Sequence, residues 1–414
     1  MLFVMLSIVC SGTLSAQRSE RTIFQFQHTG WTAKDGAPAP TYAFAQTADG
    51  FLWMAAIDGL YRFDGIRFEF YALPADLTSH PADARSLMAT PDGGLWIGLN
   101  WGGAIFLKDG RAVGYDRSKG MPAGAVFQFA FDQQGTLWAG TITGLARFDG
   151  SRWHPVGEDS GFSGKSAKIL FVDHAGTLWV ASEDTLFFLT RGDTNFRRYR
   201  GNAGEITSIG QTPDGTLWTA QLSDNAAPGD GKTRLVRPMP RQPGIEDRRI
   251  PKMFEIFGVN SALIDHAGGL WIKSRTNDGL FHVRDPKRLE MNMPSFFKEP
   301  YFENFNSKDG LTGAGLTGAQ LEDRDGNLWF SSNLGVDRFR ESDVVPITDL
   351  GGYMPLAKGD NGDAWSFYTD YPNQYLLRLH GLTATRQHLE VYPTAVNRDL
   401  NGTLWMGAYG ELSS

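Results

Sequence analysis

The stretch DGFLWMAAIDGLYRFDG, residues 49–65, holds the pattern that decides the fold. An Asp-Gly pair precedes a tryptophan in an apolar run, and two further Asp-Gly pairs follow. Asp-Gly favours tight turns because glycine accepts a positive φ. The apolar run 51–57 is typical of a strand that is buried on both faces. Together with segments 41–47, 60–63 and 67–72, the pattern predicts a four-stranded antiparallel sheet with two-residue hairpin turns.

The same phrase recurs along the chain, as in DGGLW, QGTLW, AGTLW and DGNLW. These copies hold nine of the twelve tryptophans: Trp53, Trp96, Trp138, Trp179, Trp218, Trp271, Trp329, Trp365 and Trp405. Successive intervals are 43, 42, 41, 39, 53, 58, 36 and 40 residues. A period near 40 with four short apolar runs per unit is typical of β-propeller blades. Since one such sheet cannot bury both faces alone, we expect each repeat tryptophan to fill the seam between adjacent blades.

The repeats predict an all-β chain with two parts. Residues 22–349 would form a seven-bladed propeller, with segment 22–31 providing the closing strand of blade seven. Residues 350–414 would begin a second propeller with blade eight and half of blade nine; a single ring of eight or nine blades is the alternative. Spacers 223–249 and 285–310 carry Pro, Gly and charge and are predicted to be loops. Because the pattern stops inside a blade, we expect a truncated sequence or an interrupted gene.

The N-terminus predicts where the protein is located, and the composition argues against some kinds of site and partner. Residues 1–16 are predicted to be a secretory signal peptide, with an apolar core followed by small residues up to Ala16. A lipid anchor at Cys10 is the weaker alternative, because the large Val9 precedes it. Cys10 is the single cysteine, so neither an intrachain disulfide nor a cysteine metal site is expected. The net charge of −7 argues against a nucleic-acid partner.

Two stretches carry a resemblance to a known family: WTAKDGAPAPTYAFAQTADGFLWMAAIDGLYRFDGIRFE (residues 31–69) and DRDGNLWFSSNLGVDRFRES (residues 323–342). They resemble the two-component regulator propeller repeat of bacterial sensors, and the resemblance extends from residue 31 to the C-terminus. It implies the periplasmic sensor region of histidine kinases or hybrid two-component systems. In that family two seven-bladed propellers precede an immunoglobulin-like domain, a membrane helix and an output module.

The resemblance also implies a function. The propellers of the family bind a ligand, frequently an oligosaccharide, and downstream signalling domains transmit the event. None of the eight histidines here is followed by the run typical of a phospho-accepting helix, so kinase activity is not expected in this chain. We predict no catalytic residue and no cofactor. A propeller enzyme such as a lyase and a secreted protein-binding scaffold are the alternatives, and the oligomeric state, monomer or homodimer, is left open.

Ligand residues are predicted where the loop after a repeat tryptophan departs from the repeat. These loops build the mouth of a propeller channel. An aromatic ring beside amides and arginine suits a sugar, through stacking and hydrogen bonds. The predicted residues are Asn100 and Trp101 in LNWGG, Arg275 and Asn277 in SRTND, and Tyr371 in TDYPNQY.

One loop has some features of a calcium site. Asp323, Asp325 and Asn327 present alternate oxygen ligands, and Asp399 and Asn401 do so more weakly. The twelve-residue spacing and the terminal glutamate of a calcium loop are absent. Since these residues coincide with the turn before a tryptophan strand, we interpret them as turn residues and predict no metal site.

Overall fold

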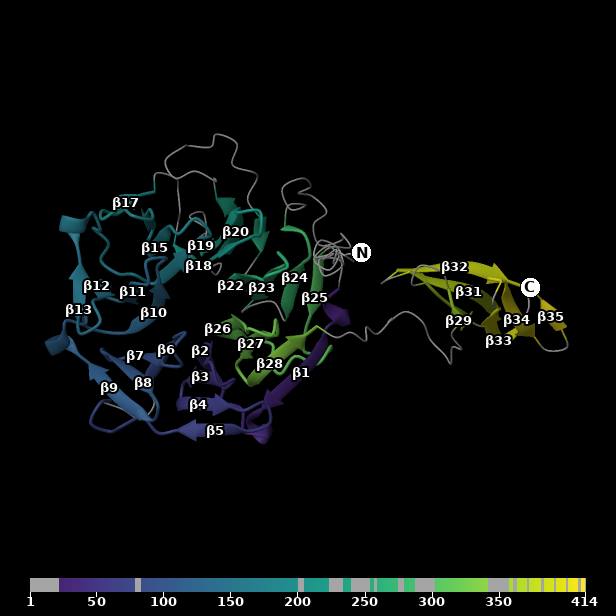
Figure 1. Cartoon of the computed structure of the whole chain (residues 1–414), viewed down its shortest axis with the longest axis horizontal. Coiled ribbons are helices and arrows are strands. Elements are labelled where there is room, and N and C mark those ends of the chain that lie inside the picture. The colour runs from purple at the N-terminus through teal and green to yellow at the C-terminus, as the bar shows by residue number, and fades with distance from the viewer. Residues whose placement is uncertain are drawn as a thin grey trace, which may run out of the picture. The chain divides into compact units, whose positions relative to one another are not determined.

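The computed structural model describes residues 22–78, 83–199, 205–222, 234–239, 254–256, 259–274, 279–286, 302–341, 357–359, 363–370, 372–380, 383–390, 392–399, 401–408 and 411–413. The chain divides into two compact units, Gln27–Glu341 and Ser342–Ser414, the second of which also includes Glu20–Phe26. Figure 1 shows the first unit as a closed ring of antiparallel sheets. The fold is therefore an all-β propeller, as the repeats predict.

Six blades of the ring follow one another in the sequence. Blade 1 contains β2 (Thr41–Gln46), β3 (Leu52–Ala56), β4 (Gly59–Phe63) and β5 (Phe68–Tyr71). Blade 2 contains β6 (Ala84–Ala89), β7 (Leu95–Leu99), β8 (Ala104–Lys108) and β9 (Arg111–Tyr115). Blade 3 contains β10 (Val126–Phe131), β11 (Leu137–Thr141), β12 (Gly144–Phe148) and β13 (Trp153–Val156).

The next three blades repeat this order. Blade 4 contains β14 (Ile169–Val172), β15 (Leu178–Ser182), β16 (Thr185–Leu189) and β17 (Arg197–Arg198). Blade 5 contains β18 (Ile206–Gln211), β19 (Leu217–Leu222), β20 (Arg234–Met239) and β21 (Phe254–Ile256). Blade 6 contains β22 (Val259–Ile264), β23 (Leu270–Ser274), β24 (Leu280–Val283) and β25 (Phe302–Phe305). Short 3₁₀ turns are η1 (Ile23–Gln25), η2 (Ala33–Asp35), η3 (Arg117–Lys119) and η4 (Glu158–Ser160).

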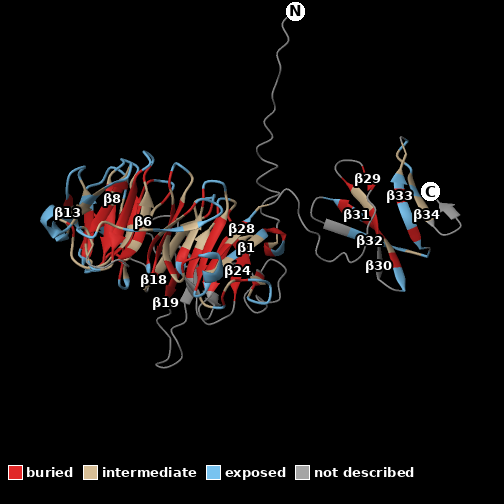
Figure 2. Ribbon diagram, turned by 90° about the horizontal axis from the view of Figure 1, so that it is seen from below, coloured by how far each residue is buried: buried red, intermediate tan, exposed pale blue. Residues whose placement is uncertain are grey.

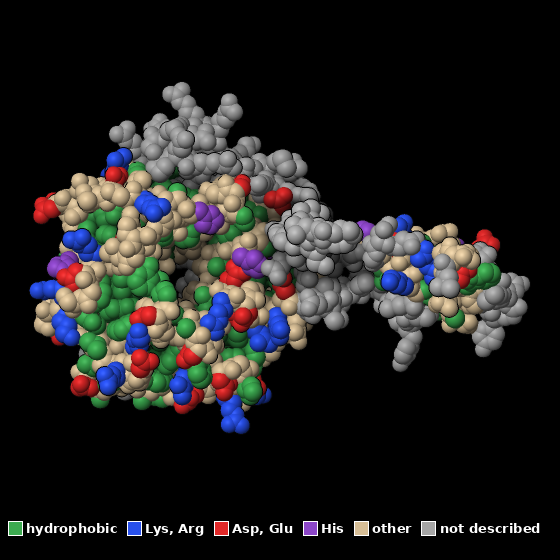
Figure 3. Space-filling model, in the orientation of Figure 1, with side chains coloured by type: hydrophobic (Ala, Val, Ile, Leu, Met, Phe, Trp, Pro, Cys, Tyr) green, Lys and Arg blue, Asp and Glu red, His purple; other side chains and the backbone are tan. Residues whose placement is uncertain are grey.

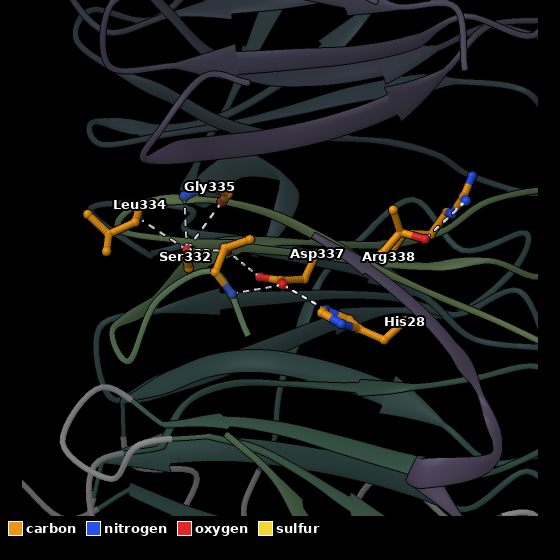
Figure 4. A network of polar contacts seen from close by, with 8 residues as sticks. His28, Ser332, Leu334, Gly335, Asp337 and Arg338 are labelled. Carbon is orange, nitrogen blue, oxygen red and sulfur yellow. Dashed lines mark hydrogen bonds and ion pairs between the residues drawn. The ribbon is translucent and has the colours of Figure 1, made fainter. Parts of the chain in front are cut away.

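Blade 7 joins the two ends of the ring. Its strands β26 (Leu316–Glu322), β27 (Leu328–Ser332) and β28 (Gly335–Arg340) are followed in space by β1 (Gln27–Thr32), which pairs antiparallel with β28. The predicted closing strand is thus confirmed. Figure 4 shows the polar network at this junction. Buried Asp337 lies 2.9 Å from His28 Nε2 and accepts hydrogen bonds from the backbone N–H and the hydroxyl of Thr312.

The repeat tryptophans lie in the second strand of each sheet, and those of the ring fill its seams. Trp53 packs with Leu95 and Ile97 of blade 2, and Trp329 packs with Phe44 and Met54 of blade 1. Buried residues accordingly gather in the strands, and exposed ones gather on the loops (Figure 2). An aspartate six residues before the tryptophan accepts the indole N–H in five repeats, at Asp132, Asp173, Asp265, Asp323 and Asp399.

Two local predictions are wrong. The turn between β2 and β3 is not a two-residue hairpin, because Thr47 N–H bonds the carbonyl of Phe51 and encloses three residues. Only Gly50, with φ of 97°, needs the left-handed region there. The predicted loops 223–249 and 285–310 contain strands β20 and β25. Blade 5 needs a third strand and blade 6 a fourth, which β20 and β25 supply. The Pro, Gly and charged residues around these two strands made the segments read as loops.

The second unit contains two further sheets. One is β29 (Ala357–Lys358), β30 (Ala364–Asp370), β31 (Asn373–His380) and β32 (Thr383–Leu389). The other is β33 (Pro393–Arg398), β34 (Leu404–Ala408) and β35 (Glu411–Ser413). Trp365 and Trp405 occupy β30 and β34, the same place in the sheet as the tryptophans of the ring. That residues 350–414 begin a second propeller stays a prediction.

Candidate functional site: the mouth of the central channel

The innermost strands of the ring carry β-bulges at equivalent places. The pairing register with the tryptophan strand shifts once near the start of β2, β6, β10, β18 and β22. A bulge inserts one unpaired residue and turns its side chain in a new direction. Each inserted residue lies eleven positions before the repeat tryptophan of its blade, and the same spacing selects Lys168 in blade 4 and Gly318 in blade 7. We call these seven positions the mouth ring: Tyr42, Arg85, Phe127, Lys168, Thr207, Asn260 and Gly318.

The mouth ring lines the central channel. A cavity of about 670 Å³ runs between the inner strands of all seven blades, and six mouth-ring residues border it. The side chain of the seventh, Asn260, lies outside the described part of the chain. Figure 3 shows the hollow at the centre of the ring. Cavities of this size with few polar groups commonly hold small ligands in proteins.

An arginine between two aromatic rings dominates one side of the mouth. The Arg85 guanidinium lies 4.6 Å from the centre of the Tyr42 ring and 5.5 Å from that of Phe127. These distances permit cation–π attraction, which holds the guanidinium plane in place. Within the described residues Arg85 forms no ion pair, so its donors are available to a ligand. On the next blade, Lys168 Nζ lies 3.2 Å from the Glu205 carboxylate.

The structure places two of the five predicted ligand residues near this mouth. Ala84, beside Arg85, pairs with Leu99, directly before Asn100. Buried Asp83 accepts hydrogen bonds from the backbone N–H groups of Asn100 and Trp101, at 2.9 and 3.2 Å. The Asn100 side chain donates to the Asp83 carbonyl at 3.3 Å and so holds the loop.

The side chain of Trp101 is described, whereas those of the other three predicted ligand residues are not. The Trp101 side chain is 69% exposed, which leaves it accessible to a ligand. Arg275, Asn277 and Tyr371 lie outside the described residues, and their roles stay predictions.

Sequence reasoning missed the mouth ring, although a signal for it exists. The predicted ligand residues lie in the loops after the tryptophan strands, whereas the bulges lie on the inner strand before each of them. At the position eleven residues before the tryptophan the blades carry Tyr, Arg, Phe, Lys, Thr, Asn and Gly. A position that packs in the core would hold similar residues in every blade. The variety here therefore indicates a surface position.

The turn residues with calcium-like spacing are explained by their own hydrogen bonds. Asp323 Oδ1 accepts from the backbone N–H groups of Asp325 and Asn327, and its Oδ2 accepts from the indole of Trp329. Across the described ranges, no three His, Cys, Asp or Glu side chains cluster as metal ligands. Within the same ranges no helix has the length and apolar character to cross a bilayer.

A buried lysine lies directly behind the channel wall. Lys273 is fully buried, and its Nζ donates a 2.9 Å hydrogen bond to the carbonyl of Ala319, an inner-strand residue that borders the channel. Burial holds the pKa of Lys273 well below its usual value, because a desolvated ammonium group is disfavoured. The equivalent positions of the other blades are small: Ala55, Gly98, Gly140, Ala181, Ala220 and Ser331.

We expect the substitution Lys273→Met to flatten the pH dependence of stability. The unfolded chain binds a proton at Lys273 below a pH of 10.5, whereas the folded chain binds it only at a much lower pH. Stability therefore falls as the pH decreases from 10.5 toward the folded pKa, by about 1.4 kcal/mol per pH unit for one proton. Urea unfolding of both proteins between about pH 7 and about pH 10 measures this slope; equal slopes would contradict the prediction.

Comparison with known proteins supports the fold and extends over both units. No family model matches the chain, and none of the curated proteins matches it in sequence. The extracellular domain of a hybrid two-component system of B. thetaiotaomicron aligns with a TM-score of 0.59 at 15% identity, over 94% of this chain and 53% of that domain. That of a one-component system from the same organism aligns with a TM-score of 0.57 at 15% identity, over 94% and 52%.

The fold is a β-propeller, as in these extracellular domains. The resemblance seen in the sequence is confirmed at this level, and the chain spans about half the length of those two extracellular domains. Virginiamycin B lyase from Staphylococcus aureus aligns with a TM-score of 0.55 at 12% identity, over 76% of this chain and 99% of the enzyme. One ring architecture thus serves both sensors and enzymes, and the choice between them depends on the site.

Proposed function

We propose that this chain is the ligand-recognising part of a periplasmic two-component sensor and that the mouth ring binds an oligosaccharide. The observation that carries the proposal is the sandwich of Arg85 between Tyr42 and Phe127 at a cavity of about 670 Å³. Aromatic rings stack on the apolar faces of sugars, and a guanidinium donates hydrogen bonds to their hydroxyls. Thr207 and the Lys168–Glu205 pair add donors and acceptors on the adjoining blades.

The lyase alternative lacks a convergent acid and base at the mouth. Of the described residues that border the channel, His174 is a histidine and Glu205 is a carboxylate. His174 lies in the turn between β14 and β15, whereas Glu205 precedes β18 at the other end of the inner strands. A general base must reach the proton that it removes, so residues at opposite ends of the channel do not form a pair. This arrangement favours recognition over turnover.

Replacing Arg85 by glutamine is expected to weaken oligosaccharide binding by about tenfold or more, because hydrogen bonds to a charged group contribute about 1.5–3 kcal/mol. A glycan array on the full chain first selects the probe, and calorimetry then compares the variants. Arg111→Gln is the matched control, since Arg111 is an exposed arginine on the outer strand β9. Unchanged affinity in Arg85→Gln would exclude the mouth ring, and cleavage of the probe would favour the lyase alternative.

Trp101 provides a second test of the same site. We expect Trp101→Ala to weaken binding of the selected oligosaccharide by roughly threefold to tenfold, since an aromatic contact is worth about 0.5–1.5 kcal/mol beyond its buried area. The 69% exposed side chain is not part of the core, so the folded state is retained. Unaltered affinity in calorimetry would remove Trp101 from the site and leave the loop with a structural role only.

A further inference from the structure

The described residues that border the central channel carry more positive than negative charge. Arg85 and Lys168 are the cations among them, and Glu205 is the one carboxylate. The whole chain, in contrast, has a net charge of −7. A hollow lined by charge of one sign attracts ligands of the opposite sign, and its low-dielectric walls strengthen this attraction. The channel is therefore suited to a ligand that carries negative charge.

The two cations of the channel differ in how their charge is compensated. The Lys168 amine lies 3.2 Å from the Glu205 carboxylate, so this pair carries no net charge. Arg85 forms no ion pair with any described residue, and the flanking rings of Tyr42 and Phe127 attract it without supplying a negative charge. The positive charge left in the channel therefore belongs to Arg85.

The carboxylate nearest to Arg85 in the sequence does not compensate this charge. Asp83 is buried, and one of its oxygens accepts hydrogen bonds from the backbone N–H groups of Asn100 and Trp101. Asp83 and Arg85 form no ion pair with each other. The β-bulge at Arg85 instead turns its side chain to the channel, which it borders. The guanidinium is thus available to an anion that enters the mouth.

Contacts between neighbouring inner strands hold Arg85 in position. The Ser86 hydroxyl donates a 2.8 Å hydrogen bond to the carbonyl of Val126 on blade 3, which joins the strands directly beside Arg85 and Phe127. Tyr42 contacts the guanidinium from blade 1, the other neighbouring blade. A group that is already held loses little entropy on binding. The N–H donors of the guanidinium form a rigid fork that matches two oxygens of one anion.

We propose that the mouth ring binds an acidic oligosaccharide, whose oxyanion, a uronate carboxylate or a sulfate ester, pairs with the Arg85 guanidinium. This inference rests on the proposed function, because it names the kind of oligosaccharide that the same site takes. Two parallel N–H···O bonds would join the guanidinium to the oxyanion. A neutral sugar that displaced water from Arg85 would leave its charge without an anion, which is unfavourable in a protein hollow. An acidic sugar removes this cost.

The test measures binding of the full chain to pairs of oligosaccharides that differ in charge. Oligomers of galacturonate, of mannuronate and of hyaluronan are each compared with their carboxyl methyl esters, and a κ-carrageenan oligomer is compared with its desulfated form. We expect at least one acidic probe to bind about tenfold more tightly than its neutral partner, because hydrogen bonds between two charged groups are about twice as strong as neutral ones. The pair that shows this ratio identifies the oxyanion as a carboxylate or as a sulfate.

Two substitutions in the channel test the role assigned to Arg85. Arg85→Gln should reduce the affinity ratio between the acidic probe and its neutral partner to about one, because the cation is lost. Glu205→Gln should strengthen binding of the acidic probe by about twofold to fivefold, and more than that of its neutral partner, since it removes a like charge and frees Lys168. Arg111→Gln is the matched control, since Arg111 is exposed on β9 and should leave the ratio unchanged.

The outcomes separate this inference from the proposed function. Equal affinity within every pair, or binding of neutral glycans alone on the glycan array, would overturn the inference and leave an oligosaccharide site in the mouth ring. A tenfold ratio that persists in Arg85→Gln would also overturn it, because another group would then recognise the charge. If no oligosaccharide on the array bound, the proposed function would be wrong, and the inference would be wrong with it.

Discussion

Replacing Asp337 by alanine is expected to lower the free energy of unfolding of the ring by about 3–5 kcal/mol, the usual cost of removing one partner of a buried pair. The Asp337 side chain is fully buried and accepts hydrogen bonds from Thr312, and His28 of the closing strand lies 2.9 Å away. Without the carboxylate, these groups lose their partner inside the seam that closes the ring. Urea unfolding followed by tryptophan fluorescence measures the loss.

The neighbouring contact between Thr29 and Arg338 supplies the control. Thr29 also lies on β1, but its hydroxyl only accepts a 3.4 Å hydrogen bond from Arg338 Nη2. Thr29→Ala should therefore change the free energy of unfolding by less than about 1 kcal/mol. Asp337→Asn, which keeps one acceptor oxygen, should fall between the two. Equal stability of Asp337→Ala and the parent chain would show that the closing strand is held by other contacts, such as the stack of Trp31 on Trp329.

Replacing Trp179 by alanine is expected to cost about 3–5 kcal/mol, as for other large-to-alanine changes in a core. Trp179 is fully buried between blades 4 and 5, where it packs with Ile206 and Leu217. Its indole N–H also donates a 2.8 Å hydrogen bond to Asp173. The substitution therefore creates a cavity and leaves a turn carboxylate without one of its donors. Equilibrium unfolding in urea, with unchanged slope against denaturant, measures the effect.

The exposed tryptophan of the ring serves as the control. Trp101 is 69% exposed, so Trp101→Ala should change the free energy of unfolding by less than about 0.5 kcal/mol. Trp179→Phe should lie between the two, because it keeps part of the buried ring surface but loses the hydrogen bond. If Trp179→Ala and Trp101→Ala were equally stable, the repeat tryptophans would not hold the seams.

The fold was predictable because its determinants are local and repeated. A turn, a tryptophan and an apolar strand recur about every 40 residues, and only stacking buries both faces of such sheets. Even the closing strand could be recognised, since a blade without its fourth strand needs one from elsewhere. Strands β20 and β25 could not be predicted, because their spacers differ in length from every other blade. The three-residue turn at Gly50 was also missed, since Asp-Gly is common to several turn types.

The candidate site was less predictable than the fold. The sequence places Asn100 and Trp101 on a loop that departs from the repeat. It does not show that Asp83 holds this loop by accepting hydrogen bonds from its backbone. Arg85 became visible as a candidate only with the bulge in β6, since a regular strand would turn that side chain to another face. The close approach of Gly94 and Phe106 joins two strands of blade 2, and no single segment of the sequence reveals it.

The pairing of β1 with β28 has a mechanical consequence. The chain enters the ring at Gln27 and leaves it after Arg340, and these two residues are partners in the same ladder. Any force or displacement carried along the polypeptide on either side of the ring is thus applied to one blade. The polypeptide of the other six blades continues beyond the ring only by way of that blade.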